Sequence, residues 1–75
     1  KMQYKQVTSS NITSIAYDAA HKWLGVEFCS GSIYNYFDVP KSVYDLLMET
    51  NRKNGSVGKV FNSNVKGIYE FVKVN

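Results

Sequence analysis

The side chains best suited to nucleophilic chemistry are His21 and Cys29, the only histidine and the only cysteine among the 75 residues. A cysteine nucleophile needs a base within hydrogen-bond distance, so these two side chains would have to meet in space. The sequence predicts a turn around His21 and puts Cys29 in or beside a strand, and no spacing pattern brings the two together. We therefore interpret His21 as a solvent-exposed turn residue and expect no Cys–His pair.

Metal and acid–base chemistry have equally little support. One histidine and one cysteine are too few for a zinc site, which takes three or four such ligands. The carboxylates are scattered through predicted turns and a helix, and no two are placed as an acid and a base would be. We expect no metal, no cofactor and no catalytic activity.

The segment from Gly55 to Lys59 invites comparison with a nucleotide-triphosphate loop. A Walker A motif would need glycine at position 53 and serine or threonine at position 60, where this chain has Lys53 and Val60. The motif is therefore absent. A simpler phosphate site is still open, because backbone N–H groups at a helix start near Lys59 can bind one phosphate.

The spacing after Ser56 predicts a short helix rather than a loop. Its apolar stripe, at i, i+3, i+4 and i+8, comprises Val57, Val60, Phe61 and Val65. Its opposite, polar stripe comprises Lys59, Asn62, Ser63 and Lys66, which we expect to face solvent. Ser56 suits the N-cap and Gly67 the C′ position. Gly58 costs the first turn about 1 kcal/mol relative to alanine, so it could be there to let a partner approach the backbone closely.

Tyr34 and Tyr36 fall on one face of a predicted strand. At a rise of about 3.3 Å per residue, alternate rings stand roughly 7 Å apart, side by side. Two interpretations are open: half of a packed core with hydroxyls at its edge, or a platform for stacking and hydrogen bonding.

These side chains are carried by a predicted α+β fold. Three short strands at residues 12–17, 23–28 and 33–37, joined by tight turns, predict an antiparallel β-meander. A main helix should follow, with Asp38 or Val39 at its cap and Pro40 in its first turn, and should end near residues 50–53. Its sheet-facing side should comprise Val43, Tyr44, Leu47 and Met48, widened by Leu46. Then come the second, short helix and a C-terminal strand at 68–74 that joins the sheet.

Length and charge narrow the class further. Residues 1–75 make one domain with a core of about 9–74, while residues 1–8 form an edge strand or are loose. No apolar stretch approaches the roughly 20 residues of a membrane span and no disulfide is possible, so we expect a cytoplasmic protein without membrane contact. The net charge is +3. Residues 50–75 carry five basic side chains and one acidic, which indicates an anionic partner or a solubilising surface.

The chain resembles the KTSC domain family in motifs spread over about residues 9–70. These are Ser10-Asn11-Ile12, Tyr17, the segment beginning at Phe28, Tyr34-Asn-Tyr36, Val39-Pro40, Tyr44, Ser56-x-Gly58-x-x-Phe61-Asn62 and Val65-Lys66-x-x-Tyr69. The family occurs at the C-terminus of some lysyl-tRNA synthetases and as small bacterial and phage proteins, which implies RNA binding by association. Its last basic position is here Lys66 rather than arginine, so planar bidentate recognition is not available there.

We therefore expect a non-catalytic binding module for RNA or a small nucleotide or other anionic ligand. In a phage copy such a pocket could sequester a host signalling nucleotide. The low charge favours a short ligand over a long duplex. The alternative is a protein-interaction or oligomerisation module that uses the spare aromatic rings. The expected ligand-binding residues are Ser10, Asn11, Tyr34, Tyr36, Ser56, Gly58, Lys59, Phe61, Asn62 and Lys66.

Overall fold

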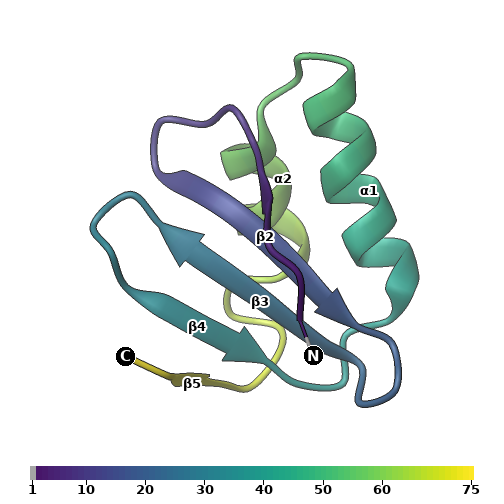
Figure 1. Cartoon of the computed structure of the whole chain (residues 1–75). Helices are drawn as coiled ribbons and strands as arrows, with labels where there is room; N and C mark the ends of the chain where they lie inside the picture. The colour runs from purple at the N-terminus through teal and green to yellow at the C-terminus, as the bar shows by residue number, and fades with distance from the viewer. Residues whose placement is uncertain (1) are drawn as a thin grey trace.

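The computed structural model describes residues 2–75 and has a five-stranded antiparallel sheet with both helices on one face (Figure 1). The strand order in the sheet, β1-β2-β3-β4-β5, is also the order along the chain. The elements are β1 (Lys5–Gln6), β2 (Ile12–Asp18), β3 (Trp23–Phe28), β4 (Ile33–Tyr36), α1 (Lys41–Arg52), α2 (Val57–Asn64) and β5 (Phe71–Lys73). The predicted α+β fold, a meander with one main helix, a short helix and a C-terminal strand, is confirmed.

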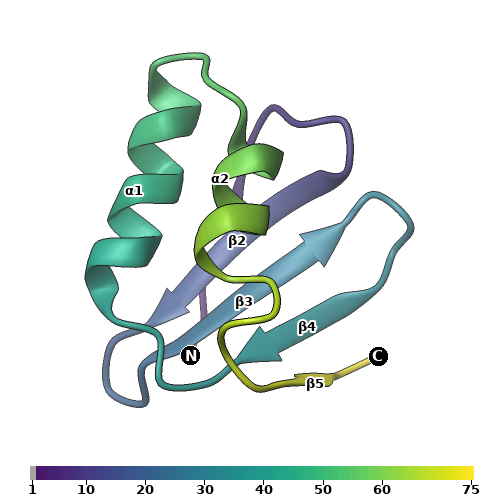
Figure 2. The same cartoon turned by 180° about the vertical axis from the view of Figure 1, so that it is seen from behind.

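The helix-facing side of the sheet forms the core. Alternation along β3 turns Leu24, Val26 and Phe28 toward the helices. α1 lies beside α2 and against β2, so the two helices close the apolar layer together (Figure 2). The buried apolar core comprises Ile12, Ile15, Leu24, Val26, Tyr36, Val39, Leu47, Val57, Phe61 and Val65.

The start of α1 differs from the prediction by one residue. Pro40 has an extended backbone and is the N-cap, so the first helical residue is Lys41. The cause is Val39, which is buried and whose N–H donates to the carbonyl of Lys22, so the helix begins only after the extended Pro40. The predicted breadth of the apolar face is also wrong at one position, because Leu46 is 43% exposed while Leu47 is fully buried.

The short helix α2 begins as predicted and ends earlier. Ser56 is its N-cap, and the Ser56 hydroxyl accepts a hydrogen bond of 3.2 Å from the N–H of Lys59. The helix ends at Asn64 with Val65 as its C-cap, so the C′ position is Lys66 and Gly67, predicted to be C′, lies one residue beyond it. Gly67 still has the left-handed conformation (φ +77°) that turns the chain toward β5 and that glycine adopts without strain.

Both ends of the chain join the sheet. The predicted C-terminal strand is shorter than 68–74, because the N–H groups of Ile68 and Tyr69 both donate to the carbonyl of Val65 and form a turn. Only Phe71–Lys73 pair with β4. At the other end β1 pairs with β2, which settles the choice between an edge strand and a loose segment in favour of a short edge strand.

Met2 and Tyr4, which precede β1, lie over the sheet face opposite the helices. A Cβ placed on Gly25 would stand 2.5 Å from the hydroxyl oxygen of Tyr4 and 3.1 Å from Cε of Met2. Glycine in the middle of β3 therefore makes room for Tyr4 and Met2, which cover the centre of this face.

Candidate binding cleft

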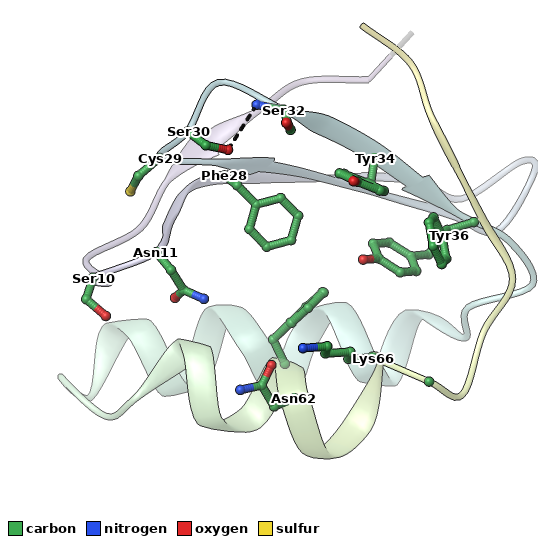
Figure 3. A pocket seen from close by; sticks show the side chains of 13 residues that line it. Ser10, Asn11, Phe28, Cys29, Ser30, Ser32, Tyr34, Tyr36, Asn62 and Lys66 are labelled. Atoms are coloured by element: carbon green, nitrogen blue, oxygen red, sulfur yellow. Dashed lines mark hydrogen bonds between the residues drawn. The ribbon is translucent and has the colours of Figure 1, made fainter.

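A cleft of about 540 Å³ lies between α2 and the helix-facing side of β3, β4 and β5 (Figure 3). We call it the aromatic cleft. Its lining comprises Ser10, Asn11, Phe28, Cys29, Ser30, Ser32, Tyr34, Tyr36, Phe61, Asn62, Lys66, Gly67 and Phe71. This volume is in the range of small-molecule sites, which run from about 300 to 1,000 Å³.

Five rings form the apolar part of the cleft and pack against one another. Tyr34 stacks on Tyr36 with ring centroids 6.3 Å apart, close to the predicted spacing. Phe71 contacts both tyrosines, at 5.2 and 5.4 Å. Phe28 and Phe61 meet edge to face at 5.7 Å, which links the sheet to α2. Because each ring is held by others, the aromatic surface is already ordered before any ligand arrives.

The sequence left two interpretations open for Tyr34 and Tyr36, a packed core or a binding platform, and the two residues differ in burial. Tyr36 belongs to the core, with 5% of its surface exposed, while Tyr34 is partly exposed and also lines the cleft. Burial, and secondarily the neighbouring Tyr34 phenol, raises the pKa of Tyr36 above its ordinary value. The Tyr36 hydroxyl points into the cleft (Figure 3) and stays a neutral donor at physiological pH.

Small polar groups form one end of the cleft. Ser10 and Asn11 come from the segment before β2, and Ser30 and Ser32 come from the turn between β3 and β4 (Figure 3). Asn75, which follows β5, anchors that turn through two hydrogen bonds of 2.7 Å. The Asn75 side-chain oxygen accepts from the N–H of Ile33, and the Asn75 side-chain nitrogen donates to the carbonyl of Gly31. The serines therefore sit on an anchored turn.

The charge of the cleft comes from one side chain. Among residues 2–75, Lys66, just past the end of α2, is the only charged residue of the lining, and no carboxylate lines the cleft. Within residues 2–75, Lys66 forms no ion pair. Asn62 lies one turn earlier on α2 and adds an amide beside it (Figure 3). The cleft therefore offers one cation for one anionic group.

Seven of the ten residues expected to bind ligand line this cleft, from four separate parts of the chain. They are Ser10, Asn11, Tyr34, Tyr36, Phe61, Asn62 and Lys66. The other three, Ser56, Gly58 and Lys59, lie at the start of α2 outside the lining. There the N–H of Lys59 is already bonded to Ser56, and the group close to Gly58 is the side chain of Asn11. The polar stripe of α2 is exposed as predicted, but only its second half faces the cleft.

Several lining residues were missed. Phe28 alternates with Val26 and Leu24 on the face of β3 that pairs with the Tyr34 and Tyr36 face of β4, so the alternation contains this signal. Phe71 had no such signal, because its register against Tyr36 cannot be read from the sequence. Ser30 and Ser32 were hidden in a turn whose orientation depends on Asn75.

The groups considered for catalysis do not assemble. His21 and Cys29 lie beyond opposite ends of β3, a strand that spans about 20 Å. His21 stacks on Trp23 and bonds Asp18 at 2.9 Å, and this hydrogen bond lowers the pKa of Asp18. Within the part of the chain that the structure describes, no three histidine, cysteine or carboxylate side chains cluster as metal ligands would. No helix of residues 2–75 has the length and apolar character needed to cross a membrane.

The fold and cleft define a small α+β domain in which a short helix and a meander enclose aromatic rings and one lysine. Sequence comparison places the chain more narrowly. The profile of the KTSC domain matches residues 8–69, and the chain belongs to the KTSC domain family. The crystal structure of a KTSC domain protein from Yersinia pestis superposes with a TM-score of 0.91 at 31% identity, covering 100% of both chains.

Two relatives show the contexts in which the domain occurs. A protein of Stutzerimonas stutzeri is 38% identical over 61 residues, which cover 81% of this chain and 80% of that protein. A lysine–tRNA ligase of Nostoc punctiforme is 36% identical over 66 residues, which cover 88% of this chain and only 11% of the ligase. The similarity to the ligase therefore concerns a small part of that protein.

Proposed function

We propose that this domain is a non-catalytic, cytoplasmic binding module whose aromatic cleft takes a small anionic ligand with a planar ring, of the size of a mononucleotide. The observation that carries the proposal is the composition of the cleft: five aromatic side chains, one lysine and no carboxylate. Rings supply stacking surface for a base, worth about 1–3 kcal/mol per base, and the lysine supplies the counter-charge for a phosphate or carboxylate.

The single cation in the cleft also favours a small ligand over a long nucleic acid. Polynucleotide binding usually rests on several phosphate contacts, commonly six to ten in DNA-binding proteins. Here Lys66 is alone in the cleft, and the next basic residue on α2, Lys59, lies outside the lining. A mononucleotide or the end of an RNA strand fits this charge better than a continuous RNA duplex. The lysine–tRNA ligase among the relatives is compatible with an RNA-derived ligand.

The test is native mass spectrometry of the protein purified from its own host, followed by calorimetry with the four ribonucleoside monophosphates. We expect a co-purifying nucleotide or a monophosphate that binds in the micromolar range. Lys66→Ala should weaken binding about tenfold or more, since charge-assisted hydrogen bonds contribute about 1.5–3 kcal/mol.

Lys59→Ala is the matched control, because it removes the same charge from a nearby position on α2 outside the cleft. Both variants should melt within a few degrees of the parent, because both side chains are exposed and lack an ion pair within residues 2–75. A bare protein that binds no monophosphate contradicts the proposal. Equal losses in the two variants contradict the cleft as the site.

A second function is favoured by a separate observation, the apolar surface at residues 68–74. The exposed side chains there are Ile68 (59%), Phe71 (55%), Val72 (46%) and Val74 (48%), beside β5 at the edge of the sheet. An exposed edge strand with apolar side chains can pair with another chain. Light scattering of the purified protein tests this: a dimer that persists at high salt and dissociates on Val72→Lys supports self-association, and a monomer excludes it.

A further inference from the structure

We infer that Asn11 is the specificity-determining hydrogen-bond donor of the aromatic cleft, and that position 58 is glycine to leave room for the Asn11 side chain. The inference rests on the proposed function and deepens it. In this arrangement the Lys66 ammonium binds the anionic group of the ligand. The Asn11 amide donates a hydrogen bond to an acceptor at the other end of the ligand.

The orientation of the Asn11 amide follows from Ser9. The Ser9 hydroxyl oxygen accepts from two backbone N–H groups, those of Asn11 and Ile12, each at 3.3 Å. Its only proton is therefore free to be donated, and it is donated to the Asn11 side chain at 3.0 Å. The Asn11 atom that receives it must be the oxygen, because the amide nitrogen cannot accept. Oδ1 is thereby engaged, and Nδ2 is the group that remains for a ligand.

The backbone of Asn11 is fixed as well. Its carbonyl accepts from the N–H of Cys29 at 2.9 Å, which ties this segment to the end of β3. Figure 3 shows the Asn11 side chain at one end of the cleft, extending toward α2, with the Lys66 side chain farther along the cleft beside Asn62. A donor held in this way loses little conformational freedom when a ligand binds.

Gly58 is explained by the same side chain. Its backbone does not require glycine, because the glycines with positive φ are Gly31 and Gly67 and position 58 is within α2. A Cβ at position 58 would instead lie 2.9 Å from Oδ1 of Asn11 and 3.6 Å from Oγ of Ser9. The glycine thus lowers the helix propensity of α2 and makes space for the Ser9–Asn11 arrangement. A residue kept at a cost to its own helix, in favour of a polar side chain in a cleft, indicates a role in binding.

The two donors of the cleft restrict the class of ligand that it can bind. The cleft presents two separate side-chain donors, the amide nitrogen of Asn11 and the ammonium of Lys66. The matching ligand carries an acceptor, such as a ring carbonyl or an unprotonated ring nitrogen, at the end of its ring remote from the anion. Pyrimidine and purine nucleoside monophosphates have this layout, and ribose 5-phosphate lacks the ring acceptor.

The test compares two variants, Gly58→Ala and Asn11→Asp, by calorimetry with uridine monophosphate and ribose 5-phosphate as probes. Alanine displaces the Asn11 amide while improving helix propensity, so the melting temperature should stay or rise. Aspartate retains an acceptor for Ser9 and loses the donor. We expect each variant to bind uridine monophosphate about tenfold more weakly, the loss of one good hydrogen bond. For Gly58→Ala, the affinity for ribose 5-phosphate should be unchanged.

The outcomes separate this inference from the proposed function. If the parent binds the nucleotide and Lys66→Ala abolishes binding, but Gly58→Ala and Asn11→Asp bind as the parent does, the cleft is the site and the role of Asn11 is refuted. A Gly58→Ala variant that melts several degrees lower also overturns the inference, since the glycine would then serve folding. A parent protein that binds neither probe contradicts the proposed function itself.

Discussion

The hydroxyl of Tyr17 donates a hydrogen bond of 2.6 Å to the backbone carbonyl of Val39. This bond connects β2 to the segment that enters α1, and the Tyr17 ring stacks on Tyr44 of that helix with centroids 5.4 Å apart. The N–H of Val39 is bonded to Lys22, so both polar groups of this buried residue are satisfied. Tyr17 therefore anchors both the segment that leads into α1 and the first turns of that helix to β2.

Removal of this hydroxyl should cost stability without touching the cleft. Tyr17→Phe keeps the stacked ring and leaves the Val39 carbonyl without its partner, so we expect a loss of about 1–2 kcal/mol in the free energy of unfolding. Urea denaturation measures it. Tyr44→Phe is the control, because no hydrogen bond of the Tyr44 hydroxyl is found among residues 2–75, and it should change stability by less than about 0.5 kcal/mol. Equal losses would show that the hydrogen bond is not the cause.

Adjacent leucines on α1 should differ sharply. Leu47→Ala empties a fully buried position and should cost about 2–5 kcal/mol. Leu46→Ala removes the same atoms from a side chain that is 43% exposed, and should cost less than about 1 kcal/mol. Thermal and urea unfolding of the two variants check this. A similar cost for both would mean that the Leu46 surface is covered in solution, for instance by a second copy.

The pH dependence of stability should report the burial of Tyr36. Burial, followed by the nearby Tyr34, raises the pKa of Tyr36 above its ordinary value of about 10, so the fold favours the neutral phenol. This contribution is complete below pH 10 and is lost as the pH rises through the folded-state pKa. In urea titrations above about pH 10, the parent should lose more stability than Tyr36→Phe. Parallel curves for the two proteins would contradict the assignment.

Binding should depend weakly on salt. With Lys66 as the only charge in the cleft, the logarithm of the affinity for a nucleoside monophosphate should fall by about one unit or less per tenfold increase in salt. Calorimetry at three salt concentrations measures the slope. A slope several times steeper would indicate several phosphate contacts, and hence a longer nucleic acid that reaches other lysines such as Lys59.

Much of the fold can be predicted because it depends on local patterns. Alternation placed Tyr34 and Tyr36 on one face of β4 at nearly the observed spacing, and the hydroxyl of Ser56 marked the start of α2. The predictions that failed depend on contacts distant in sequence. Pro40 is a cap because Val39 bonds to Lys22, and Leu46 is exposed because α1 turns only a narrow face to the core.

In the candidate site, too, the features set by local patterns could be predicted and those set by contacts distant in sequence could not. Residues of the predicted polar stripe, such as Asn62 on α2 and Lys66 just past its end, could be grouped from helical spacing alone. The pairing of Phe71 with Tyr36 could not, because no local rule sets the register of a strand that arrives after two helices. The reason for Gly58 was also hidden, since the side chain that occupies its space, Asn11, precedes it by most of the chain.

The order of the strands has a consequence for folding. The β2–β3 and β3–β4 pairs are hairpins of local contacts, whereas the β4–β5 pair joins segments separated by both helices. Closing the longer loop loses more chain entropy, so β5 is expected to dock last. Until then the edge of β4 is unpaired and its tyrosines lack Phe71. The wall of the cleft is thus the last part of the molecule to form, and a late folding intermediate would be both unable to bind and prone to aggregate.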